Sequence, residues 1–394
     1  AAAAASSPTP FLGYGGSPWA AAASGDRGVE LINLLRQCAF DVDAGSLERA
    51  DACLARIAGL LSSSSSSSAS SASPTGGGGG GGGGQATRVH RLATIFTDAL
   101  ARRLLRRPLP GAYEALLAPA ASSDPLLVAA ARRHFFDLCP FLKLAFLTSN
   151  QAILEQMEGE RVVHIVDLAG PAADPAQWLA LLRALRARPE GPPHLRITAV
   201  HDDPDALHRT SALLSKEADA HDMSFQFHPV LSRLDALDFD SLRVKTGEAL
   251  AVSSVLQLHS LLPPAADSNS TAPLALRHAH HLSPGSFGEL LERELSLAPT
   301  PPHSPRRIES FLSGLLALAP KIVVVTEQEA NHNGAAFCER FSEALYYYAA
   351  MFDCLETTAP RSAAEWGRVE RLLLGEQIRN IVACEGAERR ERHE

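Results

Sequence analysis

The first third of the chain carries apolar residues at helical spacing. Leu31, Leu34, Leu35 and Cys38 recur at intervals of three and four residues, and similar spacing continues to residue 146. Apolar positions three and four apart share one face of a helix, and several prolines break the pattern into segments. We therefore expect an all-helical cap of roughly five helices over residues 26–155.

The hydrophobic pattern changes at Arg161. Residues 161–168 form a short continuous apolar run that contains β-branched residues, which is typical of a buried parallel strand. Similar runs, alternating with helical stretches at 175–188 and 205–220, occupy residues 194–200, 224–229, 249–258 and 321–326. This alternation predicts an α/β fold with a Rossmann-like parallel sheet, and we assign residues 156–394 to that core.

Three segments have the composition of loops. Residues 1–25 contain mainly Ala, Ser, Gly and Pro, and we expect a disordered tail. Residues 62–87 combine a serine run with a glycine run, which predicts a flexible low-complexity loop between two helices. Residues 263–308 are rich in Pro, Ser and His and are interpreted as an insertion or mobile loop.

Charge, hydropathy and cysteine content exclude several classes of protein. The 394 residues include 36 basic and 44 acidic side chains, a net charge of -8, which excludes a broad basic face but leaves local basic patches. No apolar run approaches the ~18 residues of a membrane helix, so we expect no membrane association. The 6 cysteines are scattered without a CxxC pair, which indicates reduced thiols of a cytosolic or nuclear protein. The first residues lack Met and a signal peptide, which suggests a trimmed chain or a fragment.

The turn after the first strand argues against a cofactor. A nucleotide or S-adenosylmethionine site needs several glycines there, because the ligand approaches the backbone closely. This turn has one glycine, Gly170, followed by Pro171, and neither GxGxxG nor DxGxGxG occurs. Asp202 and Asp203 end the second strand, where acids contact ribose in cofactor-binding folds, but we interpret them as solvated loop residues. We expect no cofactor.

Few residues of the sequence are arranged as catalysis or metal binding would require. Two groups of residues could supply it, His278, His280 and His281, and Glu327, Glu329 and His332. The first lacks further nearby ligands and is interpreted as a solvated loop. The second ends the last strand and could form an acid–base set, but a charged strand terminus is the preferred reading. We therefore predict neither catalytic residues nor a metal site.

Two kinds of pattern suggest macromolecular contacts. Arg102, Arg103, Arg106 and Arg107 form a basic helix edge and are candidate contacts to DNA phosphates. Leu31, Leu34 and Leu35 form an LxxLL pattern that could dock in a partner's groove, and a second such pattern spans residues 312–316. Most LxxLL matches are core faces, and we expect that of at least one of the two.

Five segments resemble motifs of a single protein family. They are LLRQCA at 34–39, FFDLCPFLKLAFLTSNQAILEQMEGE at 135–160, VHIVD at 163–167, RFSEALYYYAAMFDCLE at 340–356 and IVACEGAERRERHE at 381–394. Together they resemble the plant GRAS proteins: the first resembles the opening of that family's first leucine-rich region, and the last two resemble its PFYRE region. The family's central VHIID motif corresponds to Val163, His164, Ile165, Val166 and Asp167.

The resemblance implies a nuclear, non-enzymatic regulator of transcription in gibberellin signalling and root development. It implies a helical cap over a methyltransferase-like Rossmann core. The implied partners are DELLA-type GRAS proteins and indeterminate-domain zinc-finger proteins, which supply most of the DNA contact; a homo- or heterodimer stays open. The family's C-terminal SAW region would follow Glu394, so we expect a C-terminally incomplete fragment with residues 323–325 as an uncovered strand edge.

Two other functions are compatible with the sequence. One alternative is a transcription factor that binds DNA directly and sequence-specifically, and another is an S-adenosylmethionine-dependent methyltransferase or small-molecule binder. For the central motif we expect structural roles. His164 lies inside a buried strand and needs a hydrogen-bond partner. Asp167 ends that strand and could cap the next helix or orient the loop.

Overall fold

The computed structural model describes residues 26–67, 83–117, 125–263, 307–358 and 363–393. The chain forms two compact units. We call residues 1–118 and 345–357 the helical unit, and residues 119–344 and 358–394 the sheet unit. The expected tail lies outside the described residues, as do the centre of the Ser/Gly loop and most of the 263–308 insertion.

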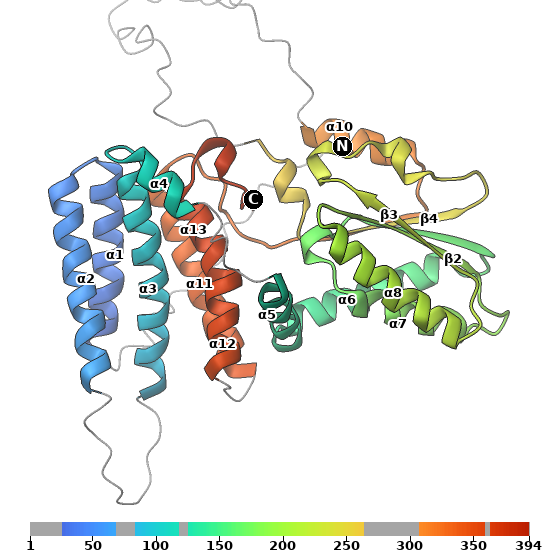
Figure 1. Cartoon of the computed structure of the whole chain (residues 1–394), viewed down its shortest axis with the longest axis horizontal. Coiled ribbons are helices and arrows are strands. Elements are labelled where there is room, and N and C mark those ends of the chain that lie inside the picture. The colour runs from blue at the N-terminus through green and yellow to red at the C-terminus, as the bar shows by residue number, and fades with distance from the viewer. Residues whose placement is uncertain (1–25, 68–82, 118–124, 264–306, 359–362, 394) are drawn as a thin grey trace, which may run out of the picture. The chain divides into compact units, whose positions relative to one another are not determined.

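The described residues of the helical unit form four helices and part of a fifth (Figure 1). They are α1 (Asp26–Asp43), α2 (Leu47–Ser67), α3 (Gly83–Leu105), α4 (Pro110–Leu117) and the second half of α11 (Phe337–Thr358). Helices α2 and α3 extend into both ends of the predicted Ser/Gly loop, because continuing an existing helix adds a hydrogen bond per residue without a new nucleation cost.

The apolar faces of these helices form a core. Helix α1 packs against both α2 and α3. Leu31 and Leu35 of α1, Ile57 of α2 and Phe96 of α3 are fully buried. Arg88 of α3 lies 2.7 Å from carboxylate oxygens of both Asp353 and Glu356, which joins α3 to α11.

The sheet unit contains the remaining elements. Its helices are α5 (Pro125–Leu138), α6 (Pro140–Gln156), α7 (Pro175–Arg186), α8 (Pro204–Ala220), α10 (Arg307–Ala317), the first part of α11, α12 (Ala363–Val369) and α13 (Gly375–Ala383). Its strands are β1 (Val162–Asp167), β2 (His194–His201), β3 (Phe225–Leu231), β4 (Ala249–Val255) and β5 (Ile322–Thr326). Short 3-10 turns lie at η1 (Gly170–Ala172), η2 (Leu234–Ala236), η3 (Phe239–Leu242), η4 (Leu258–Leu261) and η8 (Gly386–Glu388), and η7 (Glu370–Leu374) is a π-helical turn.

The five strands form one parallel sheet in the order β3-β2-β1-β4-β5. The order reverses after β3, so β1 lies at the centre, between β2 and β4, with Val163 opposite Leu195 on one side and Ala249 on the other. This is the strand order of a Rossmann-like fold, and it confirms the predicted α/β class.

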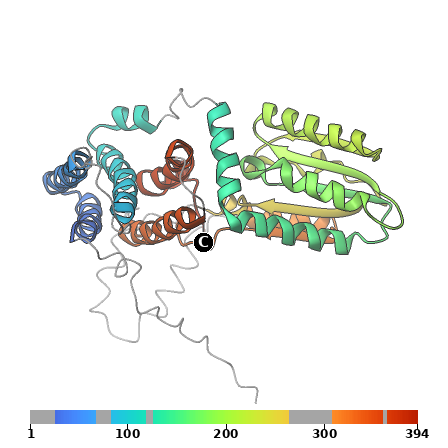
Figure 2. The same ribbon diagram turned by 90° about the horizontal axis from the view of Figure 1, so that it is seen from below.

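Helices cover both faces of the sheet (Figures 1 and 2). One face carries Val163 and Ile165 of β1 against Ile153 of α6, Trp178 of α7 and Leu214 of α8. The other face carries Val166 and Val252 against Phe311 and Leu315 of α10. Successive side chains of a strand point to opposite faces, which explains the continuous apolar run of β1.

Some boundaries differ from the sequence expectation. The described part of residues 26–156 holds six helices, α1 to α6, and the two compact units divide near residue 118 instead of 155. Ile153 and Met157 explain the division, because both pack in the core beneath the sheet. Strand β4 ends at Val255, three residues early, because Leu256 adopts a left-handed backbone with φ +53°.

Three further observations bear on the expectations from the sequence. Strand β5 is an edge of the described sheet, and its Val323 and Val325 are 38% and 48% exposed. All six cysteines are free thiols, as expected. None of the helices that the structure describes combines the length and hydropathy needed to cross a membrane.

Candidate functional site

The central motif forms strand β1, and its polar residues face opposite sides of the sheet. His164 is fully buried, with Nε2 2.8 Å from the Thr198 hydroxyl of β2 and Nδ1 2.9 Å from Glu248 Oε2. Glu248 also accepts a hydrogen bond from Arg196 Nη1 at 3.1 Å. The partner predicted for His164 is therefore present, and both of its ring nitrogens are used.

The charges around His164 determine its protonation state. Burial and the nearby Arg196 guanidinium lower the pKa of His164 from its usual 6.5 to about 4, against the attraction of Glu248. The imidazole is thus neutral near pH 7. Because a carboxylate only accepts, Nδ1–H donates to Glu248 and Nε2 accepts from Thr198. This network links three neighbouring strands near their amino ends.

Asp167 orients the turn after β1. Its carboxylate accepts hydrogen bonds from the backbone N–H of Ala169 at 2.9 Å and from Trp178 Nε1 at 2.7 Å. Burial raises the pKa of Asp167, and the two hydrogen bonds oppose that rise. The cap of α7 comes instead from Asp174, whose side chain accepts from Ala176 N–H at 2.8 Å. Of the two roles expected for Asp167, the structure shows loop orientation.

The acids at the end of β2 also have structural partners. Asp203 caps α8 by accepting from the backbone N–H of Asp205 at 2.9 Å, and Arg209 lies 3.7 Å from its other oxygen. Asp202 lies 3.2 Å from His201 Nδ1. The turns after β1 and β2 are thus occupied by the protein's own carboxylates, at the sheet edge where Rossmann folds bind nucleotides.

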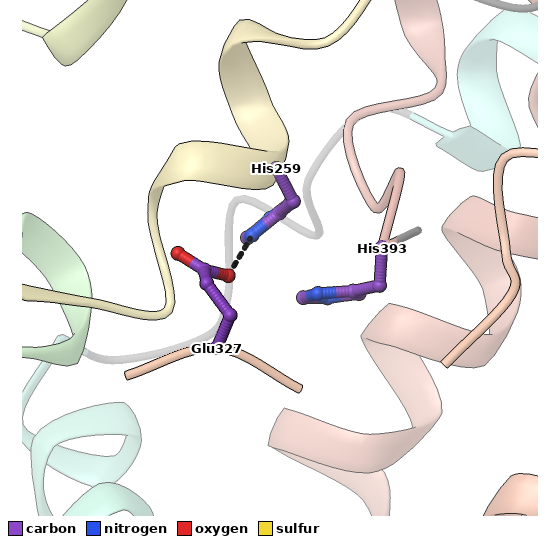
Figure 3. Close-up of side chains that lie close together, drawn as sticks. All are labelled: His259, Glu327 and His393. Carbon is purple, nitrogen blue, oxygen red and sulfur yellow. Dashed lines mark hydrogen bonds and ion pairs between the residues drawn. The ribbon is translucent and has the colours of Figure 1, made fainter. Parts of the chain in front are cut away.

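A second polar cluster lies where β4 and β5 end (Figure 3). Glu327 directly follows β5, and its Oε1 accepts from the backbone N–H groups of Gln257 at 2.9 Å and Leu258 at 2.7 Å. Its Oε2 lies 3.4 Å from Nδ1 of His259, in η4. His393, from the C-terminal segment, lies beside His259 with ring centroids 3.8 Å apart.

Two further residues complete this cluster. Glu391 Oε2 lies 3.0 Å from His393 Nε2 and 3.8 Å from His259 Nε2. His332 is buried, and its backbone N–H donates to the His393 carbonyl at 2.7 Å. Burial is the main cause that lowers the pKa of His332 to about 4. The structure therefore brings Glu327 and His332 of the predicted acid–base set near each other, joined by residues that the sequence analysis did not select.

The predicted docking leucines are not available on the surface. Leu31 and Leu35 are fully buried and Leu34 is 7% exposed, so these leucines belong to the core in this structure, and partner binding through them stays a prediction. Their spacing made them the core-facing side of α1. In the second LxxLL pattern, Leu315 is buried against the sheet and Leu316 is exposed.

The candidate phosphate-binding arginines have different surroundings. Arg102 forms an ion pair with Asp98 at 2.9 Å and donates a hydrogen bond to the Leu116 carbonyl, so its guanidinium already has partners within the helical unit. Arg103, Arg106 and Arg107 line a cavity of about 330 Å³ in that unit. Asp43 also lines this cavity and reduces its positive charge. The histidines at 278, 280 and 281 lie outside the described residues.

Sequence reasoning missed His259, Glu391 and His393, as well as Glu248 and Arg196. The pair Glu391 and His393 carries a local signal, because an acid two residues from a histidine can orient its ring. The other three stand alone in the sequence. The strand order brings Arg196 and Glu248 beside His164 at one end of the sheet and His259 beside Glu327 at the other.

The Rossmann-like sheet and the β1 motif define a GRAS protein. The model of the GRAS domain family matches residues 31–394, and the chain belongs to this family. Its relatives include Scarecrow-like protein 3 of Arabidopsis thaliana, 44% identical over 94% of this chain and 76% of that protein. GRAS family protein TF80 of Medicago truncatula is 42% identical over 91% of this chain and 80% of that protein.

More distant relatives and a solved structure agree. DELLA protein RGL1 of Arabidopsis thaliana is 35% identical over 94% of this chain, which spans 58% of that protein. The crystal structure of SCL7 in Oryza sativa is similar with a TM-score of 0.55 and 32% identity, covering 78% of this chain and 71% of that one. The GRAS domain and its Rossmann-like core are thereby shown for this chain.

Proposed function

We propose that this GRAS protein is a non-enzymatic regulator of transcription that acts in the nucleus by binding other proteins. The setting is plant development and gibberellin signalling, including the root. The family and its Scarecrow-like and DELLA relatives support this setting. The proposed partners are DELLA-type GRAS proteins and indeterminate-domain zinc-finger proteins, and the latter would supply most of the contact to DNA.

An exposed apolar surface in the sheet unit is the observation that carries the proposal. Phe141, Leu144 and Leu147 of α6 are 57%, 63% and 67% exposed. On the neighbouring helix, Leu126 is 68% exposed. Several large apolar side chains exposed on one helix indicate a surface for a protein partner, because burying them in an interface is favourable.

The non-enzymatic part of the proposal has separate support. At the first turn of a cofactor-binding Rossmann fold, free backbone N–H groups hold the phosphate or the ribose. Here Asp167 and Asp174 accept from Ala169 and Ala176 at that turn. A bound anion would have to displace a carboxylate of the protein itself, which favours a Rossmann core used for binding partners.

The experiment measures partner binding by surface variants. Purified wild-type protein and the variant Leu144→Asp/Leu147→Asp are titrated against an immobilised DELLA protein and an indeterminate-domain zinc-finger protein. We expect binding to weaken at least about tenfold, because each substitution removes apolar surface from the interface and places an unpaired carboxylate there. The matched control is Leu213→Asp on α8, where Leu213 is 49% exposed. Equal binding by wild type and the double variant would refute this surface as the site.

Direct DNA binding is the second candidate function, and the arginine-lined cavity favours it. Three guanidinium groups around one cavity suit a phosphate, at which Arg forms bidentate contacts. The test is DNA binding of the protein alone at several salt concentrations. Replacing Arg103, Arg106 and Arg107 by Ala should reduce the slope of the logarithm of DNA affinity against that of the salt concentration. The reduction should correspond to the loss of up to about three phosphate contacts. An unchanged salt slope would remove these arginines from the DNA interface.

A further inference from the structure

His259, Glu327 and His393 converge from three separate segments of the sheet unit (Figure 3). His259 belongs to η4 after β4, Glu327 follows β5, and His393 lies beyond η8. Each residue offers one ligand atom, and these three atoms lie within 4.8 Å of one another. Side chains of the type found in zinc sites thus meet at the carboxyl ends of two strands.

Their separation fits a metal ion after a small adjustment. Zn–N and Zn–O bonds of about 2.0–2.2 Å in a tetrahedral site place the ligand atoms roughly 3.3–3.6 Å apart. His259 Nδ1 and Glu327 Oε2 are already 3.4 Å apart. The three ligand atoms lie within 4.8 Å of one another, so the most distant pair has to approach by at most roughly 1.5 Å.

Glu327 is held as a preorganised anionic ligand. Its Oε1 accepts from the backbone N–H groups of Gln257 and Leu258 at 2.9 and 2.7 Å. These two bonds fix the carboxylate and direct Oε2 toward His259. A carboxylate positioned by hydrogen bonds to one oxygen binds a metal ion through the other without losing further side-chain freedom.

His393 supplies a nitrogen lone pair. The side chain is 1% exposed, and its Nε2 lies 3.0 Å from Glu391 Oε2. Because Glu391 accepts the hydrogen of Nε2, the neutral ring leaves Nδ1 without a hydrogen. Among the residues that the structure describes, this buried Nδ1 has no hydrogen-bond partner. A buried acceptor is costly when unsatisfied, and coordination would satisfy it.

We propose that His259, Glu327 and His393 bind a divalent transition-metal ion of the zinc class, with water as the fourth ligand. The donors are two imidazole nitrogens and one carboxylate oxygen, a set that suits Zn²⁺. Glu391 is a positioning residue, because it lies 3.0 Å from His393 Nε2 and 3.8 Å from His259 Nε2. The bound ion attaches the C-terminal segment to the ends of β4 and β5.

Calorimetric titration with Zn²⁺ tests the site directly. The untagged, chelator-treated protein should bind about one ion per chain, and thermal unfolding should shift upward with Zn²⁺ because only the folded site binds it. His259→Ala and His393→Ala should abolish this binding. Glu391→Gln should weaken it about 10- to 100-fold, as removal of a residue that orients a metal ligand does.

The chain offers a matched control in its other histidines. Replacing His278, His280 and His281 together by Ala removes a second potential metal-binding stretch and should leave the affinity unchanged. Absence of Zn²⁺ binding by the wild type overturns the proposal. So does loss of binding in the triple variant while His393→Ala still binds.

The proposal can still be tested if the alanine variants do not fold. Circular dichroism identifies such a defect, and Glu327→Gln, which keeps the acceptor for Gln257 and Leu258, then replaces them. The wild type loaded with Co²⁺ gives the second readout. A tetrahedral spectrum without thiolate charge-transfer bands supports the nitrogen and oxygen ligands. A thiolate-ligated spectrum contradicts these ligands, and an octahedral spectrum contradicts the four-coordinate site.

Discussion

The sheet unit contains two histidine clusters that differ in how their imidazole nitrogens are used. Near the amino ends of the strands, His164 bonds to Thr198 on one side and Glu248 on the other, so neither nitrogen is spare. Near the carboxyl ends, His393 uses Nε2 for Glu391 and leaves Nδ1 buried without a hydrogen bond among the described residues. Both rings are almost completely buried.

This difference in hydrogen bonding indicates a structural role for His164 and a ligand-binding role for His393. In the amino-end network both nitrogens of His164 are satisfied, whereas Arg196 Nε has no hydrogen-bond partner among the described residues. A buried imidazole with both nitrogens bonded contributes to a unique core. A buried acceptor without a hydrogen-bond donor, such as Nδ1 of His393, destabilises the fold unless an ion or another ligand binds it. Such an atom therefore indicates a ligand-binding site. The same residue types, histidine and glutamate, thus favour opposite roles at the two ends of one sheet.

The largest effect is expected from breaking the amino-end network. Glu248→Gln removes the charge that balances the buried Arg196, whose guanidinium lies 3.1 Å away. A buried ion pair that loses one partner costs about 3–5 kcal/mol. Urea denaturation of the variant should show a loss of that size in the free energy of unfolding.

The matched variant at the other cluster sharpens the contrast. Glu327→Gln keeps an oxygen to accept from Gln257 and Leu258, so without metal it should cost about 1 kcal/mol or less. Equal losses in the two variants would show that the clusters do not differ in the way proposed.

A somewhat smaller effect is expected from acid. The pKa of His164 is about 4 in the folded chain and 6.5 ordinarily, so between these pH values the unfolded chain binds more protons. The free energy of unfolding should therefore fall as the pH drops from 6.5 to 4, by about 3 kcal/mol for this group. Below pH 4 the contribution levels off.

The His164→Gln variant isolates this contribution. Its stability should be lower at neutral pH but should decline less steeply between pH 6.5 and 4 than that of the wild type. The difference between the two denaturation series removes the protonation of other groups from the comparison. Parallel profiles would mean that His164 is not held neutral by its surroundings.

The smallest effect concerns the turn after β1, where Gly170 lies beside Gln257. Gly170 has φ +47°, and an added Cβ would lie 3.5 Å from Gln257 Oε1, which is an ordinary contact. Gly170→Ala should therefore cost about 1 kcal/mol, from the left-handed backbone alone. A thermal-unfolding shift of a few degrees is the expected readout. A cost several times larger would mean that the turn cannot retain its conformation with a side chain present.

Individual residues show how far sequence reasoning reached. The run of β-branched and apolar residues at 161–168 predicted β1, because parallel strands are apolar on both faces. The spacing of Leu31, Leu34 and Leu35 predicted a helix face but not which side it would turn to. An apolar face is equally suited to a core or a partner, and only the packing of α1 against α2 and α3 shows that it is core.

The amino-acid sequence by itself determined the α/β class, the order of strands and helices along the chain, the absence of the glycine-rich turn, and the membership of the GRAS family. These follow from local periodicity, backbone chemistry and contiguous motifs. Tertiary structure alone decided that His164 meets Glu248 and that His259, Glu327 and His393 meet one another. Those pairs are separated by between 66 and 134 positions. The order β3-β2-β1-β4-β5 places the segments of His164 and Glu248, and those of His259 and Glu327, side by side, and the packing of the C-terminal segment adds His393.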